Sequence, residues 1–401
     1  MRYPFGPDVL DALPEPIAEL YRGLEDRLLQ EICWRLDLTG QLNEVTAQDI
    51  RALRSHGIDL ADIKSAIADI SNRSLEDVDS LLDEVVHRNR AYYASVADAA
   101  KVTMPETIVS QADADAVKRQ VQDDVGNLTR SMGFAVRVGG RPVQWLPPTQ
   151  AYQWALNMAE AEVVSGAISY DQAVTRAVKQ LAGGGLTSVR YEADGRVRYD
   201  QIDVAARRAV MSGVNQLCQR YSEQAVERLG TDLVEVSAHA GARNTGTGPE
   251  NHASWQGKIY HWAKDGQPNR TRYPDFFERT GYGTGPGLGG WNCRHTFRPY
   301  VEGVTERTYT SDQLSSIDQK PFAYQGRTYD QYQASQKQRE IERSIRKQRR
   351  IINAMEGLSG DAAAKELASA KGRLRRLSAN YRAFSRAANL PTQTQRTKVV
   401  Y

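Results

Sequence analysis

The sequence of 401 residues contains little cysteine and no long apolar run. Its three cysteines, Cys33, Cys218 and Cys293, lie far apart, so they do not form the framework of a disulfide-rich secreted protein. No run of about 18 apolar residues occurs, so the sequence predicts no membrane span. The chain also starts without a basic stretch followed by an apolar core, which predicts no secretory signal. These absences favour a protein that matures in a reducing cytoplasm.

Charge is distributed unevenly along the chain, although the formal net charge is only +3. Residues 1–100 contain 10 Lys/Arg and 19 Asp/Glu, which gives −9, and residues 337–386 contain 14 Lys/Arg and 5 Asp/Glu, which gives +9. An acidic beginning and a basic end suggest two different partners. The alternative is that both regions are simply solvated helical surfaces.

The apolar pattern predicts an α+β protein whose N-terminal half is mainly helical. Apolar residues spaced by three and four predict helices over residues 14–36, 46–57, 74–102, 106–132, 149–166 and 169–181. The helix at 46–57 has Thr46 as its predicted cap, and the one at 74–102 has Ser74, with Asp77 three residues later. The Gly- and Pro-containing stretch 139–148 is predicted to interrupt the helices.

The second half of the chain predicts a small α+β domain followed by a long helical hairpin. Residues 186–199 alternate around Asp194-Gly195 and predict a β-hairpin. A helix over 203–229 and strands within 232–240 and 254–262 complete this domain, and 329–355 and 361–389 predict two antiparallel helices. The predicted organisation is a helical, acidic region (1–138), a helical connector (139–184), the α+β domain with long Gly-rich loops (185–305) and a basic helical hairpin and tail (306–401).

The α+β domain contains a cluster of possible metal ligands. His239, His252, Cys293 and His295 offer imidazole and sulfur, the donors that suit Zn²⁺. Structural zinc sites usually carry their ligands in close pairs, however, and these histidines are not paired along the chain. The sequence therefore predicts no metal and no other cofactor, with zinc on these four residues as the alternative.

The same part of the chain suggests two further kinds of site, a cysteine hydrolase and a dinucleotide site, and the sequence around them fits both less well. Cys293 with a histidine could form the thiolate–imidazolium pair of a hydrolase or toxin-like enzyme, but the segment after it looks like a strand rather than the helix start that lowers a thiol pKa. Residues 285–290 match G-x-G-x-x-G, but neither a preceding strand nor a following helix is predicted, so a dinucleotide site is not expected. The favoured interpretation is a non-enzymatic polar structural core.

This predicted polar core consists of side chains that can satisfy one another and the exposed backbone of the glycine loops. It comprises His239, Arg243, His252, Trp255, Gln256, Gly257, Trp291, Asn292, Cys293, Arg294 and His295. Trp291 follows Gly290, an arrangement that fits an indole pressed against backbone.

Several blocks in the chain together resemble a known family. S-A-H-A-G-A-R (237–243), H-A-S-W-Q-G-K (252–258) and G-x-x-G-W-N-C-R-H (287–295) occur in this order. With the acidic helical start and the basic C-terminal helix, they resemble tailed-phage minor capsid proteins of the "minor capsid protein 2" group, which is similar to the Mu F-like minor head proteins.

The resemblance implies a structural virion component rather than an enzyme. Such proteins are made beside the portal, enter the head in few copies and act in head assembly, genome packaging or genome delivery. It therefore implies the portal or major capsid protein as partner, the head interior as the final location and the host cytoplasm as the place of assembly. The acidic residues 1–100 are the predicted docking region, because a Leu/Ile stripe at 17–38 suits a groove on a partner.

The basic C-terminal helix suggests a second partner, packaged double-stranded DNA. Phosphate contact requires only a density of Lys and Arg. The candidate contacts, spaced mostly by three and four along one predicted helix, are Arg339, Arg343, Arg346, Lys347 and Arg350. The competing prediction is that these arginines pair with the acidic N-terminal helices of the same or a neighbouring subunit. A further hypothesis for the whole chain is a general, sequence-nonspecific DNA-binding protein.

Overall fold

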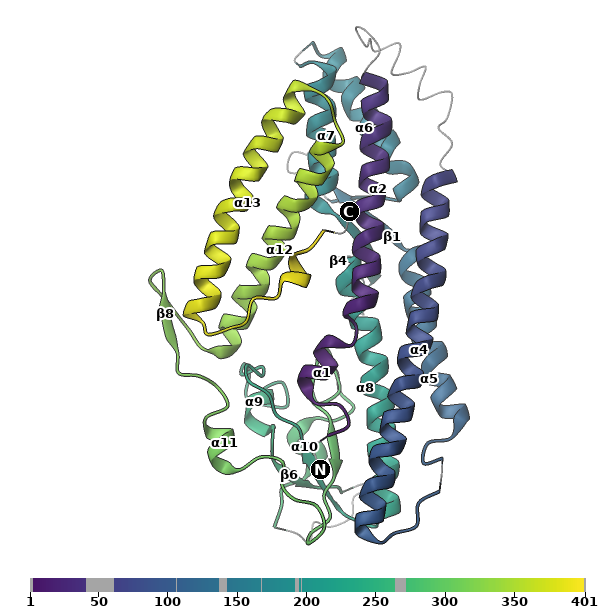
Figure 1. The fold of residues 1–401 in the computed structure, drawn as a ribbon, viewed down its shortest axis with the longest axis vertical. Coiled ribbons are helices and arrows are strands. Elements are labelled where there is room, and N and C mark those ends of the chain that lie inside the picture. The colour runs from purple at the N-terminus through teal and green to yellow at the C-terminus, as the bar shows by residue number, and fades with distance from the viewer. Residues whose placement is uncertain are drawn as a thin grey trace. The chain divides into compact units, whose positions relative to one another are not determined.

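The computed structural model describes residues 3–40, 61–105, 107–136, 143–166, 168–191, 195, 197–263 and 272–399 (Figure 1). The chain forms two compact units, each built from segments that are far apart in sequence. Unit 1 comprises Met1–Pro16, Leu75–Val125 and Arg207–Gln336, and unit 2 comprises Ile17–Ser74, Gly126–Ala206 and Lys337–Tyr401. These units cut across the four contiguous ranges expected from the sequence. No helix in the described residues is long and apolar enough to cross a membrane.

Unit 1 contains a three-stranded antiparallel sheet in the order β6-β5-β7. The central strand β5 (Leu233–Val236) is flanked by β6 (Ile259–His261) and β7 (Phe297–Pro299). All four residues of β5 are buried, which is why the strand is a short apolar run with one charged residue. The sheet and the loops beside it contribute to a core of Val226, Val234, Val236, Trp255, Tyr260, Trp262, Phe276, Leu288, Cys293 and Phe297.

Helices and a second small sheet complete unit 1. Parts of α4 (Ala61–Ala100), α5 (Gln111–Arg130) and α8 (Ile202–Leu229) belong to it, with the short helices α1 (Pro7–Ala12), α9 (His252–Trp255), α10 (Phe276–Thr280) and α11 (Ser311–Ser315). Strands β8 (Phe322–Tyr324) and β9 (Arg327–Tyr329) form an antiparallel pair. The buried hydroxyl groups of Tyr93 in α4 and Ser222 in α8 lie 2.8 Å apart, so a polar contact joins these helices inside the core.

Unit 2 contains a four-stranded antiparallel sheet in the order β2-β1-β3-β4. The predicted hairpin is confirmed as β3 (Leu186–Tyr191) and β4 (Val197–Gln201), but it pairs with β1 (Met132–Val136) rather than with the sheet of unit 1. Strands β1 and β2 (Gln144–Leu146) were not predicted. Each has five residues or fewer, too short for alternation to be visible beside a strong helical pattern.

Helices α6 (Pro148–Val164) and α7 (Tyr170–Gly184) pack on β1 of this sheet. Helix α7 begins with a capping box, because the Ser169 side chain accepts from Gln172 N and the Gln172 side chain accepts from Ser169 N. The predicted cap at Ser74 is wrong. Helix α4 begins at Ala61, and the Ser74 hydroxyl instead donates to the Ser71 carbonyl at 2.9 Å within the helix. The helix expected at 46–57, with its Thr46 cap, lies outside the described residues.

The C-terminal helical hairpin is confirmed as α12 (Gln331–Glu356) and α13 (Asp361–Ala387), which run side by side (Figure 1). Polar contacts set their antiparallel register along the whole length, from Gln338 Nε2 with Ser385 Oγ at 3.0 Å, through Arg373 Nε with Gln348 Oε1 at 2.9 Å, to Lys371 with Glu356 at 2.7 Å. A 3₁₀ turn, η2 (Thr394–Thr397), follows α13.

The first long helix, α2 (Glu15–Gly40), buries its apolar stripe within unit 2. Ile17, Tyr21, Leu24, Leu28 and Ile32 are at most 2% exposed. The stripe that was expected to dock on a partner is therefore part of the protein's own core. The large apolar side chains that α2 does expose are Trp34 and Leu38.

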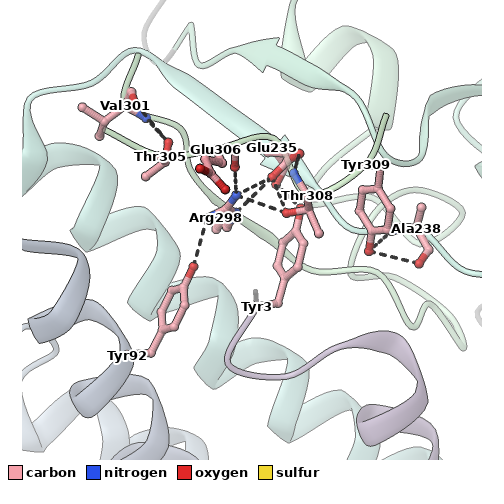
Figure 2. A network of polar contacts seen from close by, with 10 residues as sticks. All are labelled: Tyr3, Tyr92, Glu235, Ala238, Arg298, Val301, Thr305, Glu306, Thr308 and Tyr309. Atoms are coloured by element: carbon pink, nitrogen blue, oxygen red, sulfur yellow. Dashed lines mark hydrogen bonds and ion pairs between the residues drawn. The ribbon is translucent and has the colours of Figure 1, made fainter. Parts of the chain in front are cut away.

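A buried ion pair lies at the centre of the sheet of unit 1 (Figure 2). Arg298 in β7 stands directly opposite Glu235 in β5, and its Nε and Nη2 donate to Glu235 Oε2 at 3.0 and 2.8 Å. Glu235 also accepts from the amide and the hydroxyl of Thr308, both at 2.7 Å. Because a buried charge without partners is costly, these bonds make the pair tolerable.

Arg298 gains further partners from three other parts of unit 1 (Figure 2). Its Nη2 donates to the Glu306 carbonyl at 2.6 Å, its Nη1 to the Tyr92 hydroxyl at 3.4 Å, and its guanidinium lies 5.5 Å from the centre of the Tyr3 ring. The Tyr3 hydroxyl donates to the Glu235 carbonyl at 3.1 Å. The pair therefore links β5 and β7 to the chain start, to α4 and to the segment after β7.

Arg298→Met should lower the free energy of unfolding by about 3–5 kcal/mol, because it leaves the Glu235 carboxylate buried without its cation. The measurement is urea unfolding followed by circular dichroism. Arg272→Met is the matched control, since Arg272 pairs with Glu302 at 3.4 Å with both side chains mostly exposed, and no measurable change is expected there. The double variant Glu235→Leu/Arg298→Met should recover part of the loss, and equal losses in the Arg298 and Arg272 variants would contradict this account.

Candidate functional site

The site is built by three segments that meet beside β5 in unit 1. The first follows β5 and carries His239, the second is α9 with His252 and Trp255 and then Gln256, and the third is the loop that carries Cys293 and His295 into β7. His295 is fully buried, and its ring lies 4.6 Å from the His239 ring, 5.3 Å from the His252 ring and 4.8 Å from the Trp255 ring. The chain thus brings three of its histidines together, and two of them, His252 and His295, lie beside the Trp255 indole.

Gln256 determines which nitrogen of His295 carries a proton. Its Oε1 accepts from the backbone N–H of His239 at 3.0 Å, so this side-chain atom must be the oxygen. The same oxygen lies 3.1 Å from His295 Nε2, which therefore donates. In the neutral ring, the lone pair of His295 is then on Nδ1, which lies 3.6 Å from Cys293 Sγ.

His252 and His239 are held in defined tautomers by backbone carbonyls. His252 Nε2 lies 2.9 Å from the Pro286 carbonyl, and His239 Nδ1 lies 2.9 Å from the Ala240 carbonyl. A carbonyl can only accept, so His252 Nε2 donates. His239 Nδ1 also lies 3.5 Å from Arg294 Nη2, which can only donate, and the shorter contact with the Ala240 carbonyl assigns the proton to Nδ1. The lone pairs are left on His252 Nδ1 and His239 Nε2.

Burial keeps all of these groups neutral at physiological pH. It lowers the pKa of His252 to about 4, and burial together with the Arg294 guanidinium lowers the pKa of His239 to about 4. Burial, with His239 and His252 nearby, holds the pKa of His295 well below its usual range. Burial also raises the pKa of the Cys293 thiol. The pair Cys293–His295 is therefore a neutral thiol beside a neutral imidazole, not the ion pair of a cysteine nucleophile.

Four of the predicted core residues lie at the edge of this cluster instead of inside it. Trp291 is 68% exposed, and its indole lies against Gly285, where an added Cβ would be 2.6 Å from the ring. Asn292 is exposed with a φ of 55°. Arg243 donates to the Trp291 carbonyl at 3.1 Å, and Arg294 pairs with Asp11 at 3.6 Å. The backbone pressed against the indole is thus that of Gly285, not of the adjacent Gly290.

Gly257 and the glycine loop have conformational roles. Gly257 has a φ of 71°, and a Cβ there would clash with Leu314 and approach Ala238. The loop 281–292 consists of turns, such as Gly290 N to the Gly287 carbonyl at 3.1 Å. In the described residues on either side, helix α10 precedes the loop and strand β7 follows it, the reverse of the strand–loop–helix order that a dinucleotide-binding G-x-G-x-x-G requires.

No sequence pattern pointed to the residues that hold the site in place but lie outside the blocks 237–243, 252–258 and 287–295. Asn215 in α8 is buried and donates to the Cys293 carbonyl at 2.8 Å. Ser237 accepts from the Thr296 amide at 2.9 Å, and Asp11 pairs with both Arg294 and Arg207. In the sequence, Asn215 is visible only as a polar residue beside the apolar stripe of α8. This position does not identify its partner, the Cys293 carbonyl, which lies 78 residues away.

The candidate DNA contacts on α12 separate into two groups. Arg346 and Arg350 are only 7% and 4% exposed. Arg346 donates to Asp203, with Nη2 at 2.7 Å from Oδ1, and Arg350 Nη1 lies 3.2 Å from both carboxylate oxygens of Glu25. These two side chains are therefore not available to DNA in this structure. Arg343 and Lys347 are exposed, and Arg339 is partly buried.

Exposed cations lie on α13 as well. Lys371, Arg375, Arg382 and Arg386 are exposed and follow one another at intervals of four, seven and four residues. Because an α-helix has about 3.6 residues per turn, these spacings place them on one face of the helix. We refer to these four residues as the α13 cationic face.

The chain is similar to a known protein family and to a phage protein. The family model "Phage minor capsid protein 2" matches residues 5–385. A protein of Lactococcus phage LL-H, described as "Structural protein", is 25% identical over 195 residues, which is 48% of this chain and 50% of that protein. The match therefore spans about half the length of that relative. No solved structure matches the chain.

The buried thiol gives a prediction that separates a structural core from a cysteine hydrolase. Cys293 should react with iodoacetamide at neutral pH no faster than Cys33 and Cys218, because all three are buried and burial raises the pKa of each. Mass spectrometry of the alkylated peptides would measure each rate, and the urea-unfolded chain, in which all three should react, is the control. Rapid and selective alkylation of Cys293 in the native protein would instead support the enzyme.

Proposed function

Because the chain belongs to the phage minor capsid protein 2 family, we propose that it is a minor component of a tailed-phage head that binds the portal or the inner capsid surface. It would be made in the host cytoplasm, enter the head during assembly and act in assembly, genome packaging or genome delivery. The observation that carries the proposal is the family match over residues 5–385. The phage structural protein that matches part of the chain agrees with it.

The exposed end of α2 is the best-supported docking site for such a partner. Trp34 is 54% exposed and Leu38 is 45% exposed. They lie four positions apart, so both are on one helix face. Tryptophan is enriched among residues that dominate binding energy at protein interfaces. This pair, at the exposed end of the segment 17–38, replaces the buried residues of that segment as the predicted contact with the portal.

Trp34→Ser/Leu38→Ser should reduce the copies of the protein per procapsid severalfold, because it removes the exposed apolar anchors and leaves the buried stripe of α2 intact. Quantitative mass spectrometry against the portal protein would measure the ratio. Val164→Ser/Val197→Ser is the matched control, since both valines are exposed in the same unit at 58% and 44%. Deletion of residues 1–100 is unsuitable, because it removes buried residues of both units. Unchanged incorporation of the Trp34/Leu38 variant would contradict the docking site.

A second proposed activity is contact with packaged DNA through the α13 cationic face. The observation that favours it is the exposure of four cations on one face, whereas Arg346 and Arg350 of α12 are used internally. Such a face contacts phosphates without reading bases. Lys371 also pairs with Glu356, with the lysine side chain about half exposed.

Replacement of Lys371, Arg375, Arg382 and Arg386 by Ser in the full chain should weaken binding to duplex DNA and reduce the slope of log K against log salt by about 3.6, since each lost phosphate contact contributes about 0.9. Fluorescence anisotropy at several salt concentrations near about 0.1 M would measure both quantities. Duplexes of unrelated sequence should bind wild type equally well. The control variant replaces four exposed cations of unit 1, namely Lys258, Arg279, Arg307 and Arg327. Equal effects of both variants, or no binding by wild type, would contradict a specific DNA face.

A further inference from the structure

Three buried side chains of the site offer metal-binding atoms at one point. One potential ligand atom of each of His252, Cys293 and His295 lies within 4.8 Å of the others. We infer that these three residues bind one transition-metal ion of the Zn²⁺ type, with water or another small ligand in the fourth position. The inference concerns the chemistry of this cluster and does not depend on the proposed docking or DNA contact.

The hydrogen bonds already hold both histidines in tautomers that leave one ring nitrogen free to bind a metal. His295 donates through Nε2 to Gln256, and His252 donates through Nε2 to the Pro286 carbonyl. Each histidine therefore keeps its lone pair on Nδ1. A ring N–H bonded to a carbonyl or carboxylate is the usual support of a metal-ligating histidine, because it fixes both tautomer and ring orientation. The same support is present here for both histidines.

The best-defined distance agrees with tetrahedral coordination. Zinc bonds of about 2.1 Å to nitrogen and about 2.3 Å to sulfur require a nitrogen–sulfur separation of about 3.6 Å in a tetrahedral site. Cys293 Sγ and His295 Nδ1 are 3.6 Å apart. The ligand atom of His252 lies at most 4.8 Å from those of Cys293 and His295, so binding would bring the three atoms closer together by about 1 Å.

The donor set selects the metal. Two imidazoles and one thiolate suit Zn²⁺, whereas Mg²⁺ and Ca²⁺ require oxygen ligands. On binding, the Cys293 thiol loses its proton to solvent and the metal–sulfur bond forms, so one proton is released and no oxidation occurs. The ion would cross-link α9 to the loop before β7. The absence of paired ligands along the sequence no longer argues against zinc, because the fold brings the three residues together.

His239 provides the matched control for this site. Its ring stacks on His295, with 4.6 Å between ring centres, but it lies outside the group of three ligands. His239→Gln should therefore keep the metal, whereas His252→Gln and Cys293→Ser should lose it. Gln256→Leu removes no ligand, yet it should weaken metal affinity by about 10–100-fold, because it removes the support of His295.

The test uses the full chain, stripped with a chelator and titrated with Co²⁺. Wild type should bind one Co²⁺ per chain and develop the strong visible bands of tetrahedral cobalt together with a near-ultraviolet thiolate-to-cobalt charge-transfer band. The latter should disappear in Cys293→Ser and persist in Cys33→Ser and His239→Gln. The wild-type spectrum needs no substitution, so it remains decisive if a variant fails to fold. Weak bands typical of octahedral cobalt, no stoichiometric binding, or a charge-transfer band that survives in folded Cys293→Ser would overturn the inference.

Discussion

The buried carboxylate of Glu235 is the constraint on which the small sheet of unit 1 depends. Strands β5, β6 and β7 have only three or four residues each, so few backbone hydrogen bonds hold their register. Glu235 and Arg298 stand opposite each other on neighbouring strands. A shift of β7 by one residue would turn Arg298 to the other face of the sheet and leave two buried charges unpaired. Pairing of these charges therefore specifies the register, even though a buried ion pair is a weak source of net stability.

The same register positions the histidine and cysteine cluster. His239 lies four residues after Glu235, and His295 lies three residues before Arg298. The Thr296 amide donates to Ser237 at 2.9 Å, which fastens the two segments to each other between the ion pair and the cluster. Loss of the Glu235–Arg298 register would therefore displace His295 from Gln256 as well. The charge pair and the cluster act as one structural arrangement, in which strand pairing fixes the positions of the histidine and cysteine side chains.

Most of the long helices, one β-hairpin and the residues of the histidine and cysteine cluster could be predicted from the sequence. Helices α2, α6, α7, α8, α12 and α13 and the β3–β4 hairpin follow from repeated spacing, which many residues specify together. The sequence pattern could not identify strands β1 and β2, or show that Ser74 lies inside helix α4 rather than at its start. Each of these features depends on contacts with distant segments. Within the site, the motif contained His252, Cys293 and His295. It could not reveal that Asn215 in α8 donates to the Cys293 carbonyl, because that partner lies 78 residues away. Nor could it reveal that Trp291 and Asn292 are exposed, because side-chain direction in a turn-rich loop has no sequence period.

The basic helix shows why a charge pattern alone does not identify a partner. Arg346 and Arg350 belong to the same regular series as Arg339 and Arg343, yet their counterions Asp203 and Glu25 lie 143 and 325 residues away in the chain. Periodicity places a charge on a helix face, but only tertiary packing decides whether that face meets solvent or a buried carboxylate. The pair Arg350–Glu25 agrees with the competing prediction, because Glu25 lies in the N-terminal helix α2 of the same chain. Arg346 instead pairs with Asp203 in α8, which lies outside the acidic N-terminal helices. Any contact with an outside polyanion must then use cations such as those of the α13 cationic face, which packing leaves exposed.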